Sequence, residues 1–130
     1  MSGWIRKSIE KIYYKNGNIL YEGDFFSDKY EGKGKYIWEN GEYYIGERSN
    51  GNKHGKGIIY YKNVNIKYEG DFINDKCEGN GKYIYEDGEY YIGEWLNDLM
   101  HGKGILYYTN GNFYKKVILL MVYMKERENI

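Results

Sequence analysis

Four glycine pairs with G-x-G spacing are the residues that could most directly do chemistry, because glycine-rich turns of this kind cradle the phosphates of dinucleotides. That chemistry needs a strand before the glycines and a helix after them, and no helical pattern follows any of the four pairs. Recurrence of the same spacing favours a structural turn that repeats along the chain. The pairs are Gly32/Gly34, Gly55/Gly57, Gly79/Gly81 and Gly102/Gly104.

Histidine and cysteine form no evident catalytic or metal-ligating set. His54 and His101 hold the same place in two H-G-K-G segments, and the two repeat units between them predict a separation too large for a shared metal ion. Cys77 has no histidine at a neighbouring repeat position to act as its base. We therefore expect no catalytic residue, no metal site and no cofactor.

Acidic side chains recur with the same regularity as the glycines. Paired carboxylates can perform acid–base catalysis, but equally periodic lysines accompany these, which indicates solvated faces and cross-strand ion pairs. The acidic residues are Glu22, Asp24, Glu42, Glu47, Glu69, Asp71, Glu89 and Glu94.

Composition narrows the classes of function further. The 130 residues carry 19 basic and 19 acidic side chains, and this balance argues against a nucleic-acid partner. The single cysteine suits a reducing compartment, and residues 1–10 lack the apolar centre of a signal peptide. The longest apolar run, 117–124, falls short of the roughly 20 residues that span a bilayer. We expect a soluble cytoplasmic protein without a small-molecule substrate.

A tyrosine followed two residues later by glycine sets the period of the chain. It occurs at Tyr21, Tyr44, Tyr68 and Tyr91, at spacings of 23, 24 and 23 residues, and a G-x-G pair follows each time. The complete units are 21–43, 44–67, 68–90 and 91–113, and residues 1–20 form a partial or degenerate unit. The chain has 18 Tyr, 18 Gly and no Pro, which favours aromatic strands joined by glycine turns.

Each unit reads as a β-hairpin. Asn40-Gly41 and Asp87-Gly88 predict two-residue turns, because both central residues of such a turn need positive φ. This turn pairs Trp38 with Tyr43 and Ile37 with Tyr44, so that Trp38 and Tyr43 share a face.

The 24-residue unit needs a different turn, because Val64 is a poor residue for positive φ. A three-residue loop with Asn65 left-handed solves the problem and pairs Tyr60 with Tyr68. The same solution at residues 16–18 pairs Tyr13 with Tyr21. The extra residue is then a change of turn type.

The pattern Y-E-G-[DE]-[FW], followed by G-x-G-x-Y and [ND]-G-x-x-Y, resembles the MORN repeat (membrane occupation and recognition nexus). The resemblance covers 21–113 fully, and Arg48 and Val64 depart from it. It implies an all-β fold, an elongated and twisted single-layer antiparallel sheet of tandem hairpins with a groove or a flat face. Glycines of structural role are Gly23, Gly32, Gly34, Gly46, Gly55, Gly57, Gly70, Gly79, Gly81, Gly93, Gly102 and Gly104.

Residues 114–130 depart from the repeat. One interpretation is a short apolar capping helix at the C-terminus, because terminal repeats are usually atypical. The other is a frameshift: when the tail is back-translated with permitted codons and read two bases later, it can encode K-G-D-F-I-N-G-x-Y-E-G-K-G-K-Y. The coding DNA decides between them.

The first functional hypothesis is a non-enzymatic scaffold. A single sheet cannot cover both of its aromatic faces, and exposed aromatic surface with a polar rim is typical of a protein-binding site. Open edge strands also favour self-association. The candidate anchors are Trp38, Tyr43, Tyr85, Tyr90 and Trp95.

Two alternatives remain open. The resemblance implies peripheral binding to a membrane or to phosphoinositides, or a regulatory segment of a larger enzyme, and with them a cytoskeletal or membrane-associated location. Against lipid binding stands the absence of net charge. The candidate lipid-binding residues lie near the G-x-G pairs and are Lys33, Lys35, Lys53, Lys56, Lys82 and Lys103.

Overall fold

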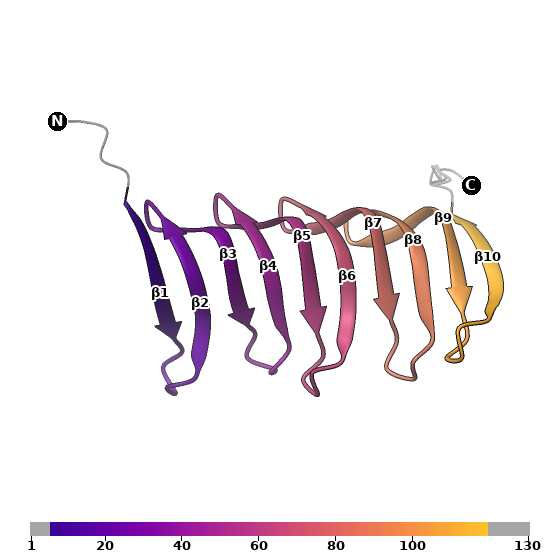
Figure 1. The fold of residues 1–130 in the computed structure, drawn as a ribbon, viewed down its shortest axis with the longest axis horizontal. Coiled ribbons are helices and arrows are strands. Elements are labelled where there is room, and N and C mark those ends of the chain that lie inside the picture. The colour runs from indigo at the N-terminus through magenta and orange to yellow at the C-terminus, as the bar shows by residue number, and fades with distance from the viewer. Residues whose placement is uncertain (1–5, 120–130) are drawn as a thin grey trace, which may run out of the picture.

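The computed structural model describes residues 6–119, whose secondary structure is all β. Ten strands lie side by side in chain order, each antiparallel to the next, and form one open sheet (Figure 1). This confirms the predicted fold. The strands are β1 (Lys7–Tyr13), β2 (Ile19–Phe26), β3 (Lys29–Ile37), β4 (Tyr43–Ser49), β5 (Asn52–Tyr60), β6 (Ile66–Ile73), β7 (Lys76–Ile84), β8 (Tyr90–Leu96), β9 (Leu99–Tyr107) and β10 (Phe113–Leu119).

The predicted tail divides between two parts of the chain. Residues 114–119 belong to β10, so this stretch is strand and the helix expected there is absent. The remainder of the tail lies outside the described residues, and the frameshift stays a hypothesis about the coding DNA. Within residues 6–119 there is no helix that could cross a membrane.

Two kinds of loop alternate along the sheet. Two-residue turns follow β2, β4, β6 and β8, and both of their central residues have positive φ, as at Asn50 (53°) and Gly51 (89°). This is the geometry that matches the twist of the flanking strands. Three-residue loops follow β1, β3, β5, β7 and β9, at the lower edge of the sheet in Figure 1.

Asn40-Gly41 lies in a three-residue loop, so the two-residue turn predicted there is wrong. The Trp38 N–H donates to the Glu42 carbonyl at 2.9 Å, and the Gly41 N–H donates to the Trp38 carbonyl at 2.9 Å. Of the loop residues only Gly41 is left-handed, with φ 92°. Asp87-Gly88 has the same geometry. A type I turn closed by a left-handed glycine needs only one residue with positive φ.

The longer loop shifts the predicted pairing by one residue. Ile37 pairs with Tyr43, and Tyr36 pairs with Tyr44. Because side chains alternate between the two faces of a strand, Trp38 lies on the face of Tyr36 and Tyr44, while Tyr43 lies on the opposite face. The predicted common face of Trp38 and Tyr43 is therefore wrong.

The 24-residue unit has a three-residue loop, but it consists of residues 62–64 and not of the predicted 63–65, and Val64 is its left-handed residue, at φ 68°, rather than Asn65. Tyr60 pairs with Ile66, not with Tyr68. The additional residue is a β-bulge at Lys67 in β6, where the pairing shifts.

The pairing predicted for the first hairpin is wrong for the same reason. Tyr13 pairs with Ile19, and a bulge separates this pair from Ile12 and Tyr21.

A side chain branched at Cβ disfavours the left-handed region, so Val64 stores backbone strain of roughly 1–2 kcal/mol.

A buried tyrosine lies across the glycine pair that joins β2 to β3, and likewise β4 to β5, β6 to β7 and β8 to β9. Gly23 pairs with Gly34, and a Cβ added at Gly34 would overlap the ring of Tyr21. The Tyr21 hydroxyl donates to the Asp24 carbonyl at 3.0 Å. The same arrangement occurs at Tyr44 over Gly46 and Gly57, at Tyr68 over Gly70 and Gly81, and at Tyr91 over Gly93 and Gly104. These glycines make room for the rings.

The first glycine of each G-x-G pair has a different role. Gly32 is left-handed, at φ 72°, where the pairing of β2 with β3 is irregular. The Asp24 carboxylate accepts the Lys33 N–H at 3.2 Å beside this bend. Gly55, Gly79 and Gly102 are equally left-handed, with Glu47, Asp71 and Glu94 as the carboxylates.

The core is a row of side chains along one face, called here the inner face; the opposite one is the outer face. The ring of Phe72 lies edge-on between Tyr44 (5.3 Å) and Tyr68 (5.2 Å). Trp95 lies in the same way between Tyr68 (5.2 Å) and Tyr91 (5.7 Å). The third and fourth units therefore each pack on the unit before them, and the buried apolar cluster extends from Tyr44 to Trp95.

Candidate binding surfaces

Five aromatic residues form a second row on the inner face, called here the loop-end ladder. Each is the last residue before a three-residue loop. Each also lies two residues after a residue that pairs with a core tyrosine of the neighbouring strand. Successive hairpins are two strands apart, so the rings follow one another at about 10 Å. The ladder consists of Tyr14, Trp38, Tyr61, Tyr85 and Tyr108.

Hydrogen bonds hold the rings of Tyr14 and Tyr61 in the ladder, and Tyr85 and Tyr108 are more than a third exposed. The Tyr14 hydroxyl donates to the Ile37 carbonyl at 2.7 Å, and the Tyr61 hydroxyl donates to the Ile84 carbonyl at 2.6 Å. Desolvation, followed by hydrogen bonding to Tyr83, raises the pKa of Tyr61. Tyr85 is 38% exposed and Tyr108 is 48% exposed. Fixed, half-exposed rings lose little conformational freedom when a partner covers them.

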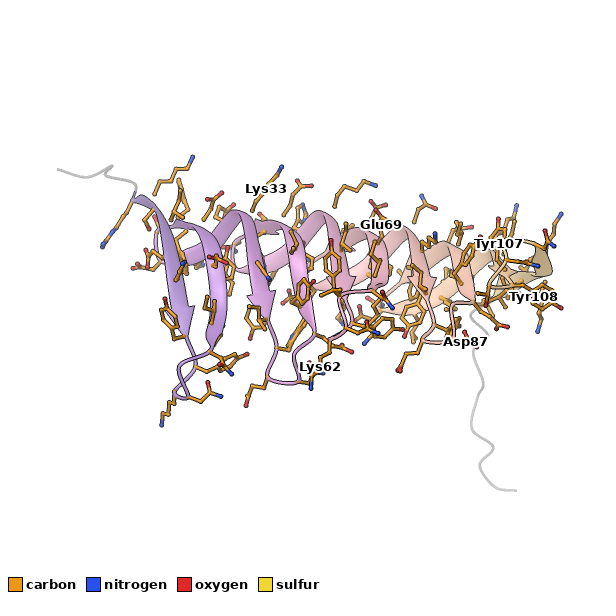
Figure 2. The ribbon with its side chains drawn as sticks, turned by 60° about the horizontal axis from the view of Figure 1, so that its bottom comes forward. Lys33, Lys62, Glu69, Asp87, Tyr107 and Tyr108 are labelled. Carbon is orange, nitrogen blue, oxygen red and sulfur yellow. The ribbon has the colours of Figure 1, made fainter. Side chains whose placement is uncertain are left out.

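A groove of about 790 Å³ lies between two successive loops at this end of the sheet. Tyr61, Ile66, Ile84 and Tyr85 contribute its apolar lining. Its charged lining residues are Glu42, Lys62 and Glu86. Figure 2 shows Lys62 and Asp87 on the neighbouring loops at the lower edge of the sheet. Ile66 and Ile84 stand opposite Tyr60 and Tyr90 of the outer face, so the groove combines residues of the ladder with residues of that face. A lining of apolar and charged side chains is typical of a surface that binds a protein segment.

Tyr43 and Tyr90, two of the predicted anchors, lie on the outer face. Tyr43 stacks on Tyr60 with ring centroids 4.6 Å apart, and the ammonium of Lys35 lies 4.6 Å from the Tyr43 ring. Tyr90 stacks on Tyr107 at 4.7 Å, with Lys82 4.5 Å from the Tyr90 ring. These rings pair with each other and with lysines on the face opposite the ladder.

The outer face mixes charge with exposed isoleucine. Ile45 is 42% exposed and Ile92 is 43% exposed, and both line a shallow groove of about 730 Å³. Glu47 stands opposite Lys33 in the pairing of β3 with β4. Figure 2 shows Lys33 and Glu69 projecting on one side of the sheet. Of the lysines predicted to meet lipid, the outer face carries Lys33, Lys35, Lys56, Lys82 and Lys103.

The structure divides the predicted anchors into three groups. Trp38 and Tyr85 belong to the loop-end ladder, and Tyr43 and Tyr90 lie on the outer face. Trp95 is 7% exposed and donates its indole N–H to the Gly81 carbonyl at 3.1 Å, so it is a core residue. Sequence reasoning missed Tyr14, Tyr61 and Tyr108. The available signal was an aromatic residue directly before each loop.

Arg48 is the one buried charged residue among those described, with 7% of its surface exposed. It takes the place that Phe25, Phe72 and Trp95 hold in the other units. Its guanidinium carbon lies within 5.0–6.0 Å of the centroids of tyrosine rings. The sequence showed the substitution but not the burial. The rings are those of Tyr21, Tyr30, Tyr36 and Tyr44.

No arrangement suited to catalysis appears in residues 6–119. Burial raises the pKa of the Cys77 thiol to about 12, which disfavours a thiolate nucleophile. His54 and His101 lie on β5 and β9, four strands apart, which corresponds to about 19 Å. Within the same residues no group of three His, Cys, Asp or Glu side chains could hold a metal ion.

The four repeats match the model of a known protein family. The model of the MORN repeat matches residues 21–43, 44–63, 68–90 and 91–113, which is more than half of the 130 residues. The second match ends directly before Val64, where the other loops have glycine. No curated protein matches the chain at a significant level.

Proposed function

Because the chain belongs to the MORN repeat family, we propose that it is a non-catalytic scaffold that binds a segment of a partner protein along the loop-end ladder. The observation that carries this proposal is the ladder itself, with one aromatic ring before each three-residue loop and a groove lined by charged residues beside Tyr61 and Tyr85. Tyrosine and tryptophan provide the rigid amphipathic contact area on which protein interfaces depend.

The spacing of the rings suits a regular segment. Steps of about 10 Å correspond to every seventh residue of an α-helix or to every third residue of a polyproline II segment. In either case successive anchors of the partner would lie on one side of the segment. The ladder is thus suited to a linear segment that contacts several hairpins at once.

The test is selection of peptides from a displayed library on the full chain. For the selected peptides, Trp38→Ala and Tyr85→Ala should each weaken binding at least about thirtyfold, because truncation of a central aromatic anchor costs about 2 kcal/mol or more. Tyr43→Ala on the outer face is the matched control and should leave binding unchanged. Binding that is sensitive only to Tyr43→Ala would assign the function to the outer face instead.

A second candidate function rests on the common placement of five lysines on the outer face near exposed Ile45 and Ile92. We propose, as the alternative, adsorption of this face to anionic membranes. The neighbouring carboxylates oppose it, since each basic residue contributes only about 1 kcal/mol at such a surface. Sedimentation with phosphatidylcholine vesicles, with and without phosphatidylserine, is the test. Salt-sensitive binding to the anionic vesicles alone would support it, and absence of binding would reject it.

A further inference from the structure

Two cationic side chains replace apolar ones at a single cross-strand pair of the inner face. Arg48 of β4 stands opposite Lys53 of β5. The corresponding pairs of the other hairpins consist of aromatic residues, cysteine and methionine. They are Phe25 with Tyr30, Phe72 with Cys77, and Trp95 with Met100. The second unit thus brings two positive charges into a row that is otherwise uncharged.

These two charges share one carboxylate. The side chains of Arg48 and Lys53 are 5% and 16% exposed. Asp75 lies 3.9 Å from the Arg48 Nη1 and 3.5 Å from the Lys53 Nζ, and its own side chain is 49% exposed. The same Asp75 oxygen also accepts the Lys53 backbone N–H at 2.8 Å. One positive charge therefore remains in excess in a largely desolvated place.

The hydrogen bonds of Arg48 are also incomplete. Its guanidinium has five N–H groups to donate, and its hydrogen bond in the structure is a long one, from Nη1 to the Gly51 carbonyl at 3.4 Å. Nε is buried without any partner, alone in this respect among the side chains of residues 6–119. The surrounding rings attract the cation, but they do not replace a hydrogen-bond acceptor. The site is short of one acceptor and one negative charge.

The pair of cations lies beside the loop-end ladder. The Lys53 Nζ is 5.7 Å from the ring of Trp38, the second member of the ladder. Half-exposed Asp75 demonstrates that a carboxylate at the protein surface reaches both cations. A segment that covers Trp38 would therefore bring its neighbouring side chain close to Lys53 and Arg48.

We propose that Arg48 and Lys53 bind one carboxylate of the partner segment, supplied by an Asp or Glu side chain or by its C-terminus. This inference rests on the proposed function of the ladder. A carboxylate offers two oxygens in a plane, which matches the fork of a guanidinium, and it neutralises the excess charge. The pair thereby fixes the position of an acidic residue relative to the segment contacted by Trp38.

The experiment uses two displayed peptide libraries, one with free C-termini and one with the peptides embedded in the display protein. Selection on the full chain should enrich peptides with an acid at one fixed position, or free C-termini in the first library alone. Replacement of that acid by its amide should weaken binding about tenfold, the ratio that corresponds to one charge-assisted contact. On Arg48→Phe the same replacement should have little effect, which is the sign of direct coupling.

The variants are chosen from residues that the chain already uses at these positions. Arg48→Phe repeats the first and third units and Lys53→Met repeats the fourth. Lys56→Asn on the outer face, which repeats Asn80 of the third unit, is the control that should bind like the wild type. Circular dichroism verifies folding of each. A second readout is the NMR signal of the Arg48 Nε–H, which should shift when an acidic peptide binds. The chain has three arginines, at positions 6, 48 and 127, so this signal is readily assigned.

The outcomes separate this inference from the function on which it rests. If the selected peptides carry no acid, or bind Arg48→Phe as tightly as the wild type, the carboxylate site is refuted while the ladder stands. If no peptide is enriched on the wild type, or if Trp38→Ala binds every peptide equally well, the ladder itself is refuted and the carboxylate site with it.

Discussion

Replacement of Arg48 by phenylalanine should increase the free energy of unfolding, even though it removes a residue that four tyrosine rings surround. The losses are the cation–π attraction, about 2 kcal/mol for a desolvated guanidinium, and the two long contacts of Nη1, with Asp75 at 3.9 Å and with the Gly51 carbonyl at 3.4 Å. The gain includes the removal of the unpaired Nε, worth about 1–3 kcal/mol, and of the remaining desolvation cost of a buried ion.

The new ring should also make the aromatic contacts that phenylalanine makes at the same position of another unit. Phe72 lies edge-on to the tyrosines of its own unit and of the preceding one, Tyr68 and Tyr44. By the same geometry a phenylalanine at 48 would meet Tyr44 and Tyr21, at roughly 0.5–1.5 kcal/mol for each pair. Lys53 would keep Asp75 to itself. The net expectation is a gain of about 1–3 kcal/mol, because replacement of a buried ion pair by well-packed apolar residues is neutral or stabilises by about 1–4 kcal/mol.

Urea denaturation followed by circular dichroism and tryptophan fluorescence measures this change as a shift of the midpoint at constant slope. Arg48→Met, which removes the charge without adding a ring, should give a smaller gain. Phe72→Arg is the reverse change and should destabilise the fold by about 1–3 kcal/mol, because it buries a cation at a site where Asp98, which accepts the Cys77 N–H at 2.8 Å, takes the place that Asp75 has beside Arg48. A loss of more than about 1 kcal/mol on Arg48→Phe would refute the reasoning, since the guanidinium would then be better satisfied than its contacts indicate.

Four further predictions concern the repeat. Gly34→Ala should destabilise the fold by about 2 kcal/mol or more, because the new Cβ overlaps the ring of Tyr21. Urea titration measures this change in the free energy of unfolding. Gly17→Ala is the comparison for left-handed backbone strain alone, because its Cβ would meet open space. Val64→Gly should stabilise the fold by roughly 0.5–1 kcal/mol in the same assay, since it relieves the strain at φ 68°. Burial raises the pKa of Tyr21 to about 12, above the unfolded value near 10. The protonated Tyr21 therefore contributes fully to stability below pH 10, and this contribution is lost as the pH rises through 12. Thermal unfolding at pH 8 to 12, with Tyr21→Phe as the comparison, tests this. Cys77 should resist a thiol reagent at pH 8 until the chain unfolds, because its pKa lies near 12; rapid labelling of the folded chain would contradict that.

The architecture was predictable from the sequence because each unit repeats the same few requirements. A tyrosine needs two glycines beneath it, and the paired strands around it need turns at both ends, so the spacing of Tyr21, Gly23 and Gly34 alone defines a hairpin. A single copy would have left the assignment of a hairpin ambiguous, and the repetition of this spacing in register removed the ambiguity.

The register was not predictable by the same means. Asn-Gly serves two-residue turns and three-residue loops alike, since in both the glycine is left-handed. The actual two-residue turns include Asn74-Asp75 and Asn97-Asp98, which contain no glycine. A slip of one residue exchanges the two faces of a strand, so the predicted anchors were divided between the faces. The placement of Trp38 beside Lys53, rather than beside Tyr43, could come only from the structure.

The bulges give the sheet a period longer than the repeat. Hairpins β1–β2, β5–β6 and β9–β10 carry the extra residue after the loop, while β3–β4 and β7–β8 do not. The structural module is consequently a pair of units, about 47 residues, rather than one. Arrays that grow or shrink by whole modules keep bulged and regular hairpins in alternation. Duplication of a single unit would set two hairpins of the same kind side by side, whereas duplication of a pair of units keeps bulged and regular hairpins in alternation.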